Sequence, residues 1–143
     1  MSTALPSPEK FLPHRAPFLF IDSLTFVDPG VAATGLWHLT GDEWFFPGHF
    51  PGRPTLPGVL MCEAIAQMGG IAVLSSSEYD GKLALFGGLD GARFRRQVVP
   101  GDTLELEAEI HRMSGRGGKG AGRAILNGKV ACECDLMLVL VDA

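Results

Sequence analysis

The chain has 143 residues, of which 46% are hydrophobic and 20% charged, and its formal net charge at pH 7 is −4. This length and composition predict a single globular domain, residues 1–143, with a sizeable core. The acidic balance argues against binding to nucleic acid or to an anionic membrane surface, because both attract clustered positive charge. The N-terminus lacks the features of a signal peptide, and no apolar stretch reaches the roughly 20 residues that span a bilayer, so a cytoplasmic protein is expected.

The first part of the chain favours a β-hairpin. Residues 6–17 are punctuated by prolines and allow at most a short helix around residues 8–12. Residues 18–27 are rich in aromatic and β-branched side chains and lead into an Asp-Pro-Gly turn, which predicts a strand. Residues 31–40 are predicted to form a second strand that pairs with the first.

A long buried helix is predicted over residues 57–76. Pro57 suits the first helical turn, where its missing N–H would have no intrahelical partner. Apolar residues cover most of the helix circumference, so the helix should be buried on nearly all sides. Gly69 and Gly70 weaken helix propensity but should let another backbone come close. These features suggest a central helix wrapped by a sheet.

The rest of the chain is predicted to consist of antiparallel strands. Two runs, residues 82–88 and 92–99, precede a Pro-Gly-Asp turn. Residues 103–110 alternate apolar with polar side chains, so one face of that strand should be wet. The Asn-Gly pair at 127–128 is a preferred hairpin turn, and residues 136–141 are apolar on both faces, as suits a strand between a core and a partner. One helix followed by such strands is an α+β pattern.

A glycine-rich stretch, residues 114–120, contains the G-x-G-x-x-G spacing of dinucleotide-binding loops. Here it joins two predicted strands, no helix follows, and no Ser or Thr follows Lys119 to contact a phosphate, so we reject nucleotide binding. A hairpin tip with Arg116 and Lys119 in solvent is expected instead.

The chain has three cysteines, Cys62, Cys132 and Cys134. They lack the spacing of metal ligands, and no matching pair of histidines or cysteines occurs elsewhere. Cys132 and Cys134 would share one face of a strand. Reduced, partly buried thiols are therefore expected, and no metal site.

His49 lies in a loop that proline and glycine should hold in one shape. Pro47-Gly48 precedes it and Pro51-Gly52 follows it, so the prolines fix φ while the glycines permit unusual values. A lone histidine is usually structural. A rigidly held loop histidine is also a candidate for proton transfer, because imidazole titrates near neutral pH.

Glu63 interrupts the apolar sequence of the predicted helix. Burial disfavours a charged carboxylate, so a carboxyl group here could act as an acid near neutral pH. The alternative is a structural glutamate at a seam, hydrogen-bonded to Gln67 one turn later. The N–H groups near Gly58 and Val59 sit at a helix N-terminus, which favours an anion or a carbonyl oxygen. With His49, this set suits removal of a proton next to a carbonyl with loss of a neighbouring hydroxyl.

Four segments resemble the FabZ family, the β-hydroxyacyl-acyl carrier protein dehydratases of type II fatty acid synthesis. In chain order they are HRAPFLFID (14–22), FFPGHFPGRPTLPGVLMCEAIAQ (45–67), ARFRRQVVPGD (92–102) and NGKVACE (127–133). The resemblance runs through nearly the whole chain and implies a hotdog fold, in which a curved antiparallel sheet wraps a long central helix. It also implies a homodimer with composite active sites, and a trimer of dimers as a further assembly.

The resemblance further implies the reaction, dehydration of a (3R)-hydroxyacyl chain on acyl carrier protein to the trans-2-enoyl product. His49 would take the C2 proton, and Glu63 of the other subunit would help the 3-hydroxyl leave as water. The Gly58 N–H would hold the thioester oxygen, and Gln67 would orient Glu63. The substrate hangs on the phosphopantetheine arm of the carrier protein, and no metal or redox cofactor is implied. The expected substrate-binding set is completed by Val59, Phe46, Phe50 and Ala16.

Related families and local departures leave alternatives open. A sister family that also isomerises the double bond carries aspartate at the helix position, so Glu63 favours simple dehydration. Hotdog acyl thioesterases share the fold but lack the GHFPG loop, and a non-catalytic subunit that binds acyl carrier protein would not need His49 and Glu63. Ala16 stands where the family usually has a tyrosine associated with gating the acyl tunnel, and Ser23 and Trp44 also depart from the usual residues. Chain length, and a specialised polyketide or polyene substrate, therefore stay open.

A docking surface for acyl carrier protein, which is acidic, is expected at Arg93, Arg95 and Arg96. Alternation along a strand would put Arg93 and Arg95 on one face and Arg96 on the other. The alternative is that these arginines only bridge strands or subunits.

Overall fold

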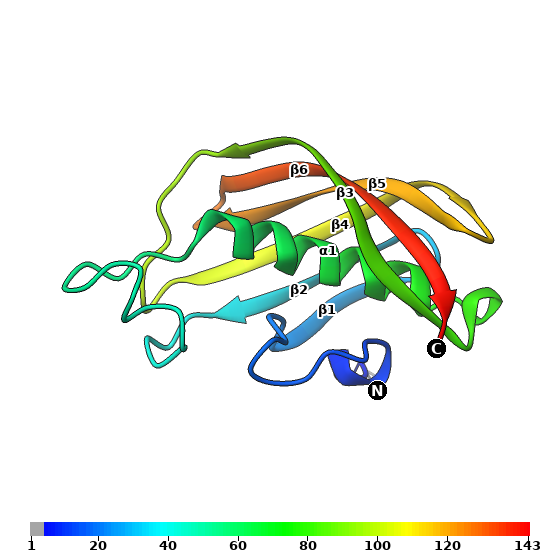
Figure 1. Ribbon diagram of the computed structural model, residues 1–143, viewed down its shortest axis with the longest axis horizontal. Helices are drawn as coiled ribbons and strands as arrows, with labels where there is room; N and C mark the ends of the chain where they lie inside the picture. The colour runs from blue at the N-terminus through cyan, green and yellow to red at the C-terminus, as the bar shows by residue number, and fades with distance from the viewer. Residues whose placement is uncertain (1–4) are drawn as a thin grey trace.

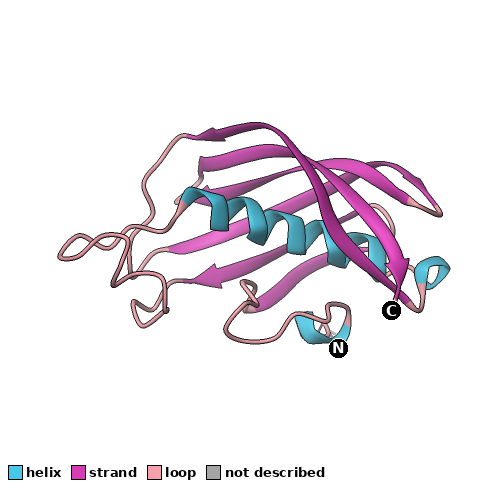
Figure 2. Cartoon of the chain, viewed as in Figure 1, coloured by secondary structure: helices cyan, strands magenta, loops and turns pink. Residues whose placement is uncertain are grey.

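The computed structural model describes residues 5–143, so the first four residues of the predicted 1–143 domain lie outside the described residues. The elements in chain order are η1 (Pro8–Lys10), β1 (Ser23–Asp28), β2 (Ala32–His38), α1 (Gly58–Leu74), η2 (Ser77–Tyr79), β3 (Lys82–Phe94), β4 (Thr103–Ser114), β5 (Gly117–Leu126) and β6 (Lys129–Asp142). The six strands form one antiparallel sheet in the order β1-β2-β4-β5-β6-β3. The sheet curves around α1, and the long loops gather where α1 begins (Figures 1 and 2). The predicted hotdog fold is confirmed.

The helix α1 is buried through most of its length, as its apolar sequence predicts. From Met61 to Val73, every residue except Glu63 is buried. The helix begins one residue later than predicted, because Pro57 caps it with an extended backbone, and it ends at Leu74. The expectation of a close backbone approach at the two glycines is wrong. Added Cβ atoms there would meet side chains, Leu136 from Gly69 at 3.3 Å and Leu12 from Gly70 at 3.2 Å.

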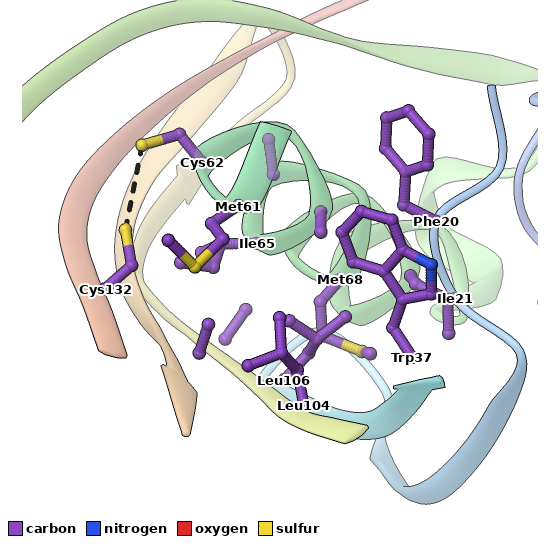
Figure 3. Close-up of a cluster of buried hydrophobic side chains, with 14 of the residues drawn as sticks. Phe20, Ile21, Trp37, Met61, Cys62, Ile65, Met68, Leu104, Leu106 and Cys132 are labelled. Atoms are coloured by element: carbon purple, nitrogen blue, oxygen red, sulfur yellow. Dashed lines mark hydrogen bonds between the residues drawn. The ribbon is translucent and has the colours of Figure 1, made fainter. Parts of the chain in front are cut away.

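The first strand is shorter than predicted and begins at Ser23. The preceding segment turns toward α1, because the N–H of Phe20 donates to the side chain of Gln67 at 2.9 Å. Phe20 also stacks on Trp37 of β2, with ring centroids 4.9 Å apart. Figure 3 shows both rings next to α1 in the core. The apolar residues 18–22 thus pack against the helix before the strand starts.

One continuous strand, β3, replaces the two predicted at residues 82–88 and 92–99. The pairing of β3 with β6 shifts register near Gly88 and between Asp90 and Arg93, so the strand continues through these irregularities. The strand then ends at Phe94, and the N–H groups of Arg95 and Arg96 both donate to the carbonyl of Ala131. Residues 95–99 are therefore a connection and not a strand.

The turns and hairpins of the second half follow the prediction. Asn127 and Gly128 both have positive φ, 50° and 79°, as the tight turn between β5 and β6 requires. Only Gly115 and Arg116 join β4 to β5, so Arg116 lies at the hairpin tip, whereas Lys119 lies within β5; both side chains are exposed. Among residues 5–143 no helix is long and apolar enough to cross a membrane.

The last strand, β6, buries one apolar face and exposes the other. Leu136, Leu138 and Leu140 lie in the core, whereas Met137 and Val139 are 40% and 37% exposed. The core face is as predicted. Among the described residues, the second face is only partly covered.

The three cysteines are free thiols, as predicted, and they are buried more deeply than expected. Cys62 on α1 points toward Cys132 on β6, with the sulfur atoms 3.9 Å apart (Figure 3). Contact with Cys62 and burial raise the pKa of Cys132 and of Cys134.

Candidate active site

His49 is held in a compact loop by main-chain hydrogen bonds. Its carbonyl accepts from the N–H of Thr55 at 2.7 Å, and Phe50 and Arg53 exchange two hydrogen bonds at 3.0 and 2.9 Å. The ring of His49 stacks on that of Phe50, with centroids 4.2 Å apart. The rigid loop that the Pro-Gly pairs predict therefore closes around the histidine.

The Nδ1 atom of His49 lies 2.7 Å from the carbonyl oxygen of Thr55. A carbonyl oxygen only accepts hydrogen bonds, so Nδ1 must carry the hydrogen. In the neutral ring this leaves Nε2 with a free lone pair. The loop therefore fixes the tautomer in which Nε2 can take a proton.

The His49 side chain lines a cavity of about 500 Å³ beside the N-terminus of α1. Gly58 and Val59 line the same cavity. Their N–H groups belong to the first helical turn, so they have no intrahelical partner. The positive end of the helix dipole favours a partly negative oxygen at this position. This cavity combines a base with donors for a carbonyl oxygen, and we call it the base half-site.

Glu63 lines a different cavity, of about 390 Å³, together with Gln67 and His14. Its side chain is 20% exposed, so it is less buried than the sequence suggests. The Nε2 atom of Gln67 donates to Oε2 of Glu63 at 3.1 Å. Most of the remaining lining is apolar. We call this cavity the acid half-site.

Gln67 is 2% exposed, and both ends of its amide are hydrogen-bonded. Its Oε1 accepts from the N–H of Phe20 at 2.9 Å, and its Nε2 donates to the carbonyl of Phe18 at 2.9 Å as well as to Glu63. These partners fix the orientation of the amide, because the main-chain group that contacts Oε1 is a donor and the one that contacts Nε2 is an acceptor. Gln67 therefore ties the N-terminal segment to the acid half-site.

Within one chain His49 and Glu63 line separate cavities. Of the predicted substrate-binding residues, Phe46 is 3% exposed and packs on Phe45 with centroids 4.7 Å apart. Phe50 is exposed beside His49, and Ala16 is exposed in the N-terminal segment. None of Phe46, Phe50 and Ala16 is among the described residues that line the two half-sites.

The three arginines do not alternate along a strand as expected, because β3 ends at Phe94. Arg95 pairs with Glu133 of β6, Nε to Oε1 at 3.0 Å. Arg95 and Arg96 line the base half-site, and Arg93 is exposed on β3. Two of the arginines thus line the cavity that holds His49, and one of them also bridges to the next strand.

Sequence reasoning did not single out His14. Its Nε2 atom lies 3.7 Å from Oε2 of Glu63, although 49 positions separate the two residues. The available signal was its place at the start of the HRAPFLFID segment. No local pattern indicates that this segment folds back onto α1.

A larger hollow, about 640 Å³, lies over the outer face of the sheet, away from both half-sites. Some of its polar side chains pair with each other. Arg123 donates to Glu107 at 3.0 Å, and His111 lies 3.0 Å from Glu109. Across residues 5–143, no cluster of three or more metal-ligating side chains comes together.

Residues 12–135 match the family model described as a FabA-like domain. The chain is 54% identical to a 3-hydroxyacyl-acyl carrier protein dehydratase FabZ from Moorella thermoacetica, over 90% of each chain. It is 48% identical to the FabZ protein of Staphylococcus epidermidis, over 94% of this chain and 93% of the other. It is 46% identical to the FabZ protein of Clostridium novyi, over 98% of this chain and 99% of the other.

One solved structure supports the fold. It is a chain of the dehydratase heterocomplex ApeI:P from Xenorhabdus doucetiae, which superimposes with a TM-score of 0.80 over 96% of this chain and 93% of the other. The sequence identity is 18%, so this likeness concerns the fold alone.

Proposed function

The chain belongs to the FabZ dehydratases of the FabA-like family, and on that premise we propose that it removes water from a (3R)-hydroxyacyl chain on acyl carrier protein. The product is the trans-2-enoyl thioester, and the reaction is a step of fatty acid synthesis. The observation that carries the assignment is the free Nε2 of His49, in one cavity with the N–H groups that begin α1.

In the proposed reaction, Nε2 of His49 takes a proton from C2 of the thioester. The negative charge that develops on the thioester oxygen is stabilised by the N–H of Gly58, which costs no reorganisation because the helix end is already in place. Proton transfer of this kind contributes roughly 10²- to 10⁴-fold to the rate. Val59 borders the same cavity and completes the carbonyl site.

The second half of the reaction belongs to Glu63. As the C2=C3 double bond forms, the C3–O bond breaks and the protonated carboxyl of Glu63 gives its proton to the departing hydroxyl. One water leaves, and the proton held by His49 returns through solvent to Glu63. Gln67 orients the carboxyl, supported by its hydrogen bond of 3.1 Å to Oε2. Loss of water changes no overall oxidation state, and the proposed acid and base move the protons, so the proposal includes no metal or redox cofactor.

The separation of the two half-sites supports a homodimer with composite active sites. Glu63 of one subunit would meet the base half-site of its twin. The strand β3 is an edge of the sheet and carries several exposed apolar side chains: Leu85, Phe86, Leu89 and Phe94. An exposed apolar edge strand tends to associate with another chain, which covers it. We place the dimer contact at this edge, with a trimer of dimers as the further assembly.

The partner that delivers the substrate is acyl carrier protein, which carries the acyl chain on phosphopantetheine. Arg95 and Arg96, which line the base half-site, and Arg93 on the adjoining strand offer the positive charge that an acidic carrier would contact. We place the reaction in the cytoplasm, as befits a step of fatty acid synthesis.

The test is incubation of the purified protein with 3-hydroxyacyl carrier proteins of several chain lengths, with mass spectrometry of the product. Loss of one water is expected, without release of free thiol. His49→Ala and Glu63→Gln should each lower kcat by at least about 100-fold, with thermal melting close to that of the wild type. Release of thiol would instead identify a thioesterase, and full turnover in both variants would overturn the assignment of the site.

A further inference from the structure

His14 contacts the proposed acid from outside the helix that carries it. The Nε2 atom of His14 lies 3.7 Å from Oε2 of Glu63, which is within reach of a charge interaction and longer than a hydrogen bond. The two side chains are 25% and 20% exposed and line the same cavity. The imidazole is therefore part of the acid half-site.

Hydrogen bonds hold the backbone on both sides of His14. Arg15 donates from Nη1 to the carbonyls of Leu12 and His14, at 2.8 and 2.7 Å. A few residues later, the carbonyl of Phe18 accepts from Gln67 at 2.9 Å. The same glutamine that contacts Glu63 thus anchors the segment that carries the imidazole.

The other ring nitrogen of His14 indicates the tautomer. Nδ1 is buried and has no hydrogen-bond partner among residues 5–143. A buried N–H without an acceptor is costly, and such groups are rare in folded proteins. The hydrogen of the neutral ring is therefore better placed on Nε2, the atom that faces Glu63.

Both neighbours of Glu63 then present an N–H to the same oxygen. Gln67 donates to Oε2 at 3.1 Å, and the Nε2 atom of His14 lies 3.7 Å from the same oxygen, close enough for electrostatic attraction. An oxygen that accepts one hydrogen bond and has a second N–H dipole beside it acts as an acceptor and is a poor place for a proton. The proton of the neutral carboxyl is left on Oε1.

We infer that His14 is a positioning residue, which together with Gln67 holds Oε2 of Glu63 as the acceptor oxygen and leaves Oε1–H to protonate the departing hydroxyl. This inference rests on the proposed function. His14 exchanges no proton with the substrate. Its contribution is the orientation of the carboxyl, so its loss lowers kcat and leaves KM nearly unchanged.

The test uses three substitutions at His14, assayed for dehydration of a 3-hydroxyacyl carrier protein. A glutamine amide reaches the position of Nε2, whereas an asparagine amide reaches only that of Nδ1. We expect His14→Gln to keep kcat within about 3-fold of wild type, and His14→Asn and His14→Ala to lose roughly 10- to 100-fold, the cost of a misplaced group. Added imidazole should restore part of the activity of His14→Ala, since it can occupy the vacated space. The matched control is His111→Ala, the same change at an exposed histidine of β4.

The outcomes separate this inference from the proposed function. If wild type does not dehydrate the substrate, the proposed function fails and the inference fails with it. If wild type is active and His14→Ala matches it, or if glutamine is no better than asparagine, only the inference fails. A loss that tracks a lower Tm and does not respond to imidazole would show a merely structural role and would also overturn it. Should His14→Ala not fold, the comparison of glutamine with asparagine decides alone.

Discussion

Gly58, the first residue of α1, lies directly against the ring of Phe94 at the end of β3. A Cβ atom built on Gly58 would stand 2.7 Å from both Cδ1 and Cε1 of that ring. Real contacts are not that short, so any side chain at this position must displace the ring or the helix end. The contact between Gly58 and Phe94 thus helps to fix the positions of both the first N–H groups of α1 and the wall of the base half-site.

Gly58→Ala should therefore impair catalysis. Movement of the helix end would shift the proposed donors to the thioester oxygen, and movement of the ring would change the wall of the base half-site. In either case we expect kcat to fall by about 10-fold or more, since small misplacements are costly. Steady-state kinetics measures the effect. Gly115→Ala is the matched control, because nothing lies within 4 Å of a Cβ atom there.

Relief of the contact should restore part of the activity. We expect Gly58→Ala with Phe94→Leu to exceed Gly58→Ala alone, with Phe94→Leu as the reference. If Gly58→Ala keeps the wild-type kcat, the contact does not control the position of the N–H donors.

The sequence predicted the parts of the fold that depend on local chemistry. The apolar circumference of α1 marked it as the central helix, and the Asn127-Gly128 turn and the alternation in β4 fixed the neighbouring hairpins. The loop histidine and the helix glutamate were likewise visible, because each breaks the pattern of its surroundings. These features are decided by backbone conformation and periodicity within a few residues.

The parts that the sequence did not reveal depend on distant contacts. The strand start moved to Ser23 because the N–H of Phe20 bonds to Gln67, 47 positions away. The end of β3 at Phe94 depends on two N–H groups that share the carbonyl of Ala131. His14 meets Glu63 only because the N-terminal segment folds back along α1. None of these pairings leaves a local pattern.

Glu43 should contribute to stability in a pH-dependent way. Its carboxylate accepts from the N–H groups of Thr40 at 3.0 Å and Gly41 at 2.8 Å, in the loop before the aromatic cluster at residues 44–46. Partial burial raises its pKa, but these hydrogen bonds outweigh burial and the pKa lies below the ordinary 4.5. A lowered folded-state pKa means stability that is present above the unfolded pKa and lost as pH falls through the folded value.

We expect Glu43→Gln to lower the free energy of unfolding near pH 7 by about 0.5–1 kcal/mol, because water partly screens the carboxylate. The difference from wild type should shrink as the pH falls below 4.5. Urea denaturation at several pH values measures it. A difference that is constant with pH would contradict the role of the charge.

The buried thiols should be protected in the folded protein. Cys62, Cys132 and Cys134 are at most 4% exposed, so a thiol reagent should label them only after unfolding. Contact with Cys62 and burial raise the pKa of Cys132 and of Cys134, whereas the pKa of a thiol in the unfolded chain is about 8.5. Stability should therefore fall as the pH rises through that value, because the unfolded chain releases protons that the folded chain retains.

Labelling kinetics with and without urea tests the protection, and the slope of stability above about pH 8.5 tests the ionisation. Cys132→Ala should show a shallower slope than wild type. Rapid labelling of the folded protein would contradict the burial.

The edge strand β3 should carry the dimer contact. Leu89 is 42% exposed on this strand, and Leu89→Lys would place a charge in the proposed contact. We expect the variant to become monomeric in light scattering and to lose dehydratase activity. Phe26→Lys is the matched control, because Phe26 is 50% exposed on β1, the opposite edge of the sheet. A dimeric Leu89→Lys would move the contact elsewhere.

The composite site is tested most directly by mixing two inactive variants, His49→Ala and Glu63→Gln, under conditions that exchange subunits. In a mixed dimer, one active site would combine the intact His49 of one subunit with the intact Glu63 of the other. An equal mixture should then recover about a quarter of wild-type activity, since half the dimers are mixed and each has one intact site. Mixed dimers that form and stay inactive would contradict a base and an acid drawn from different subunits.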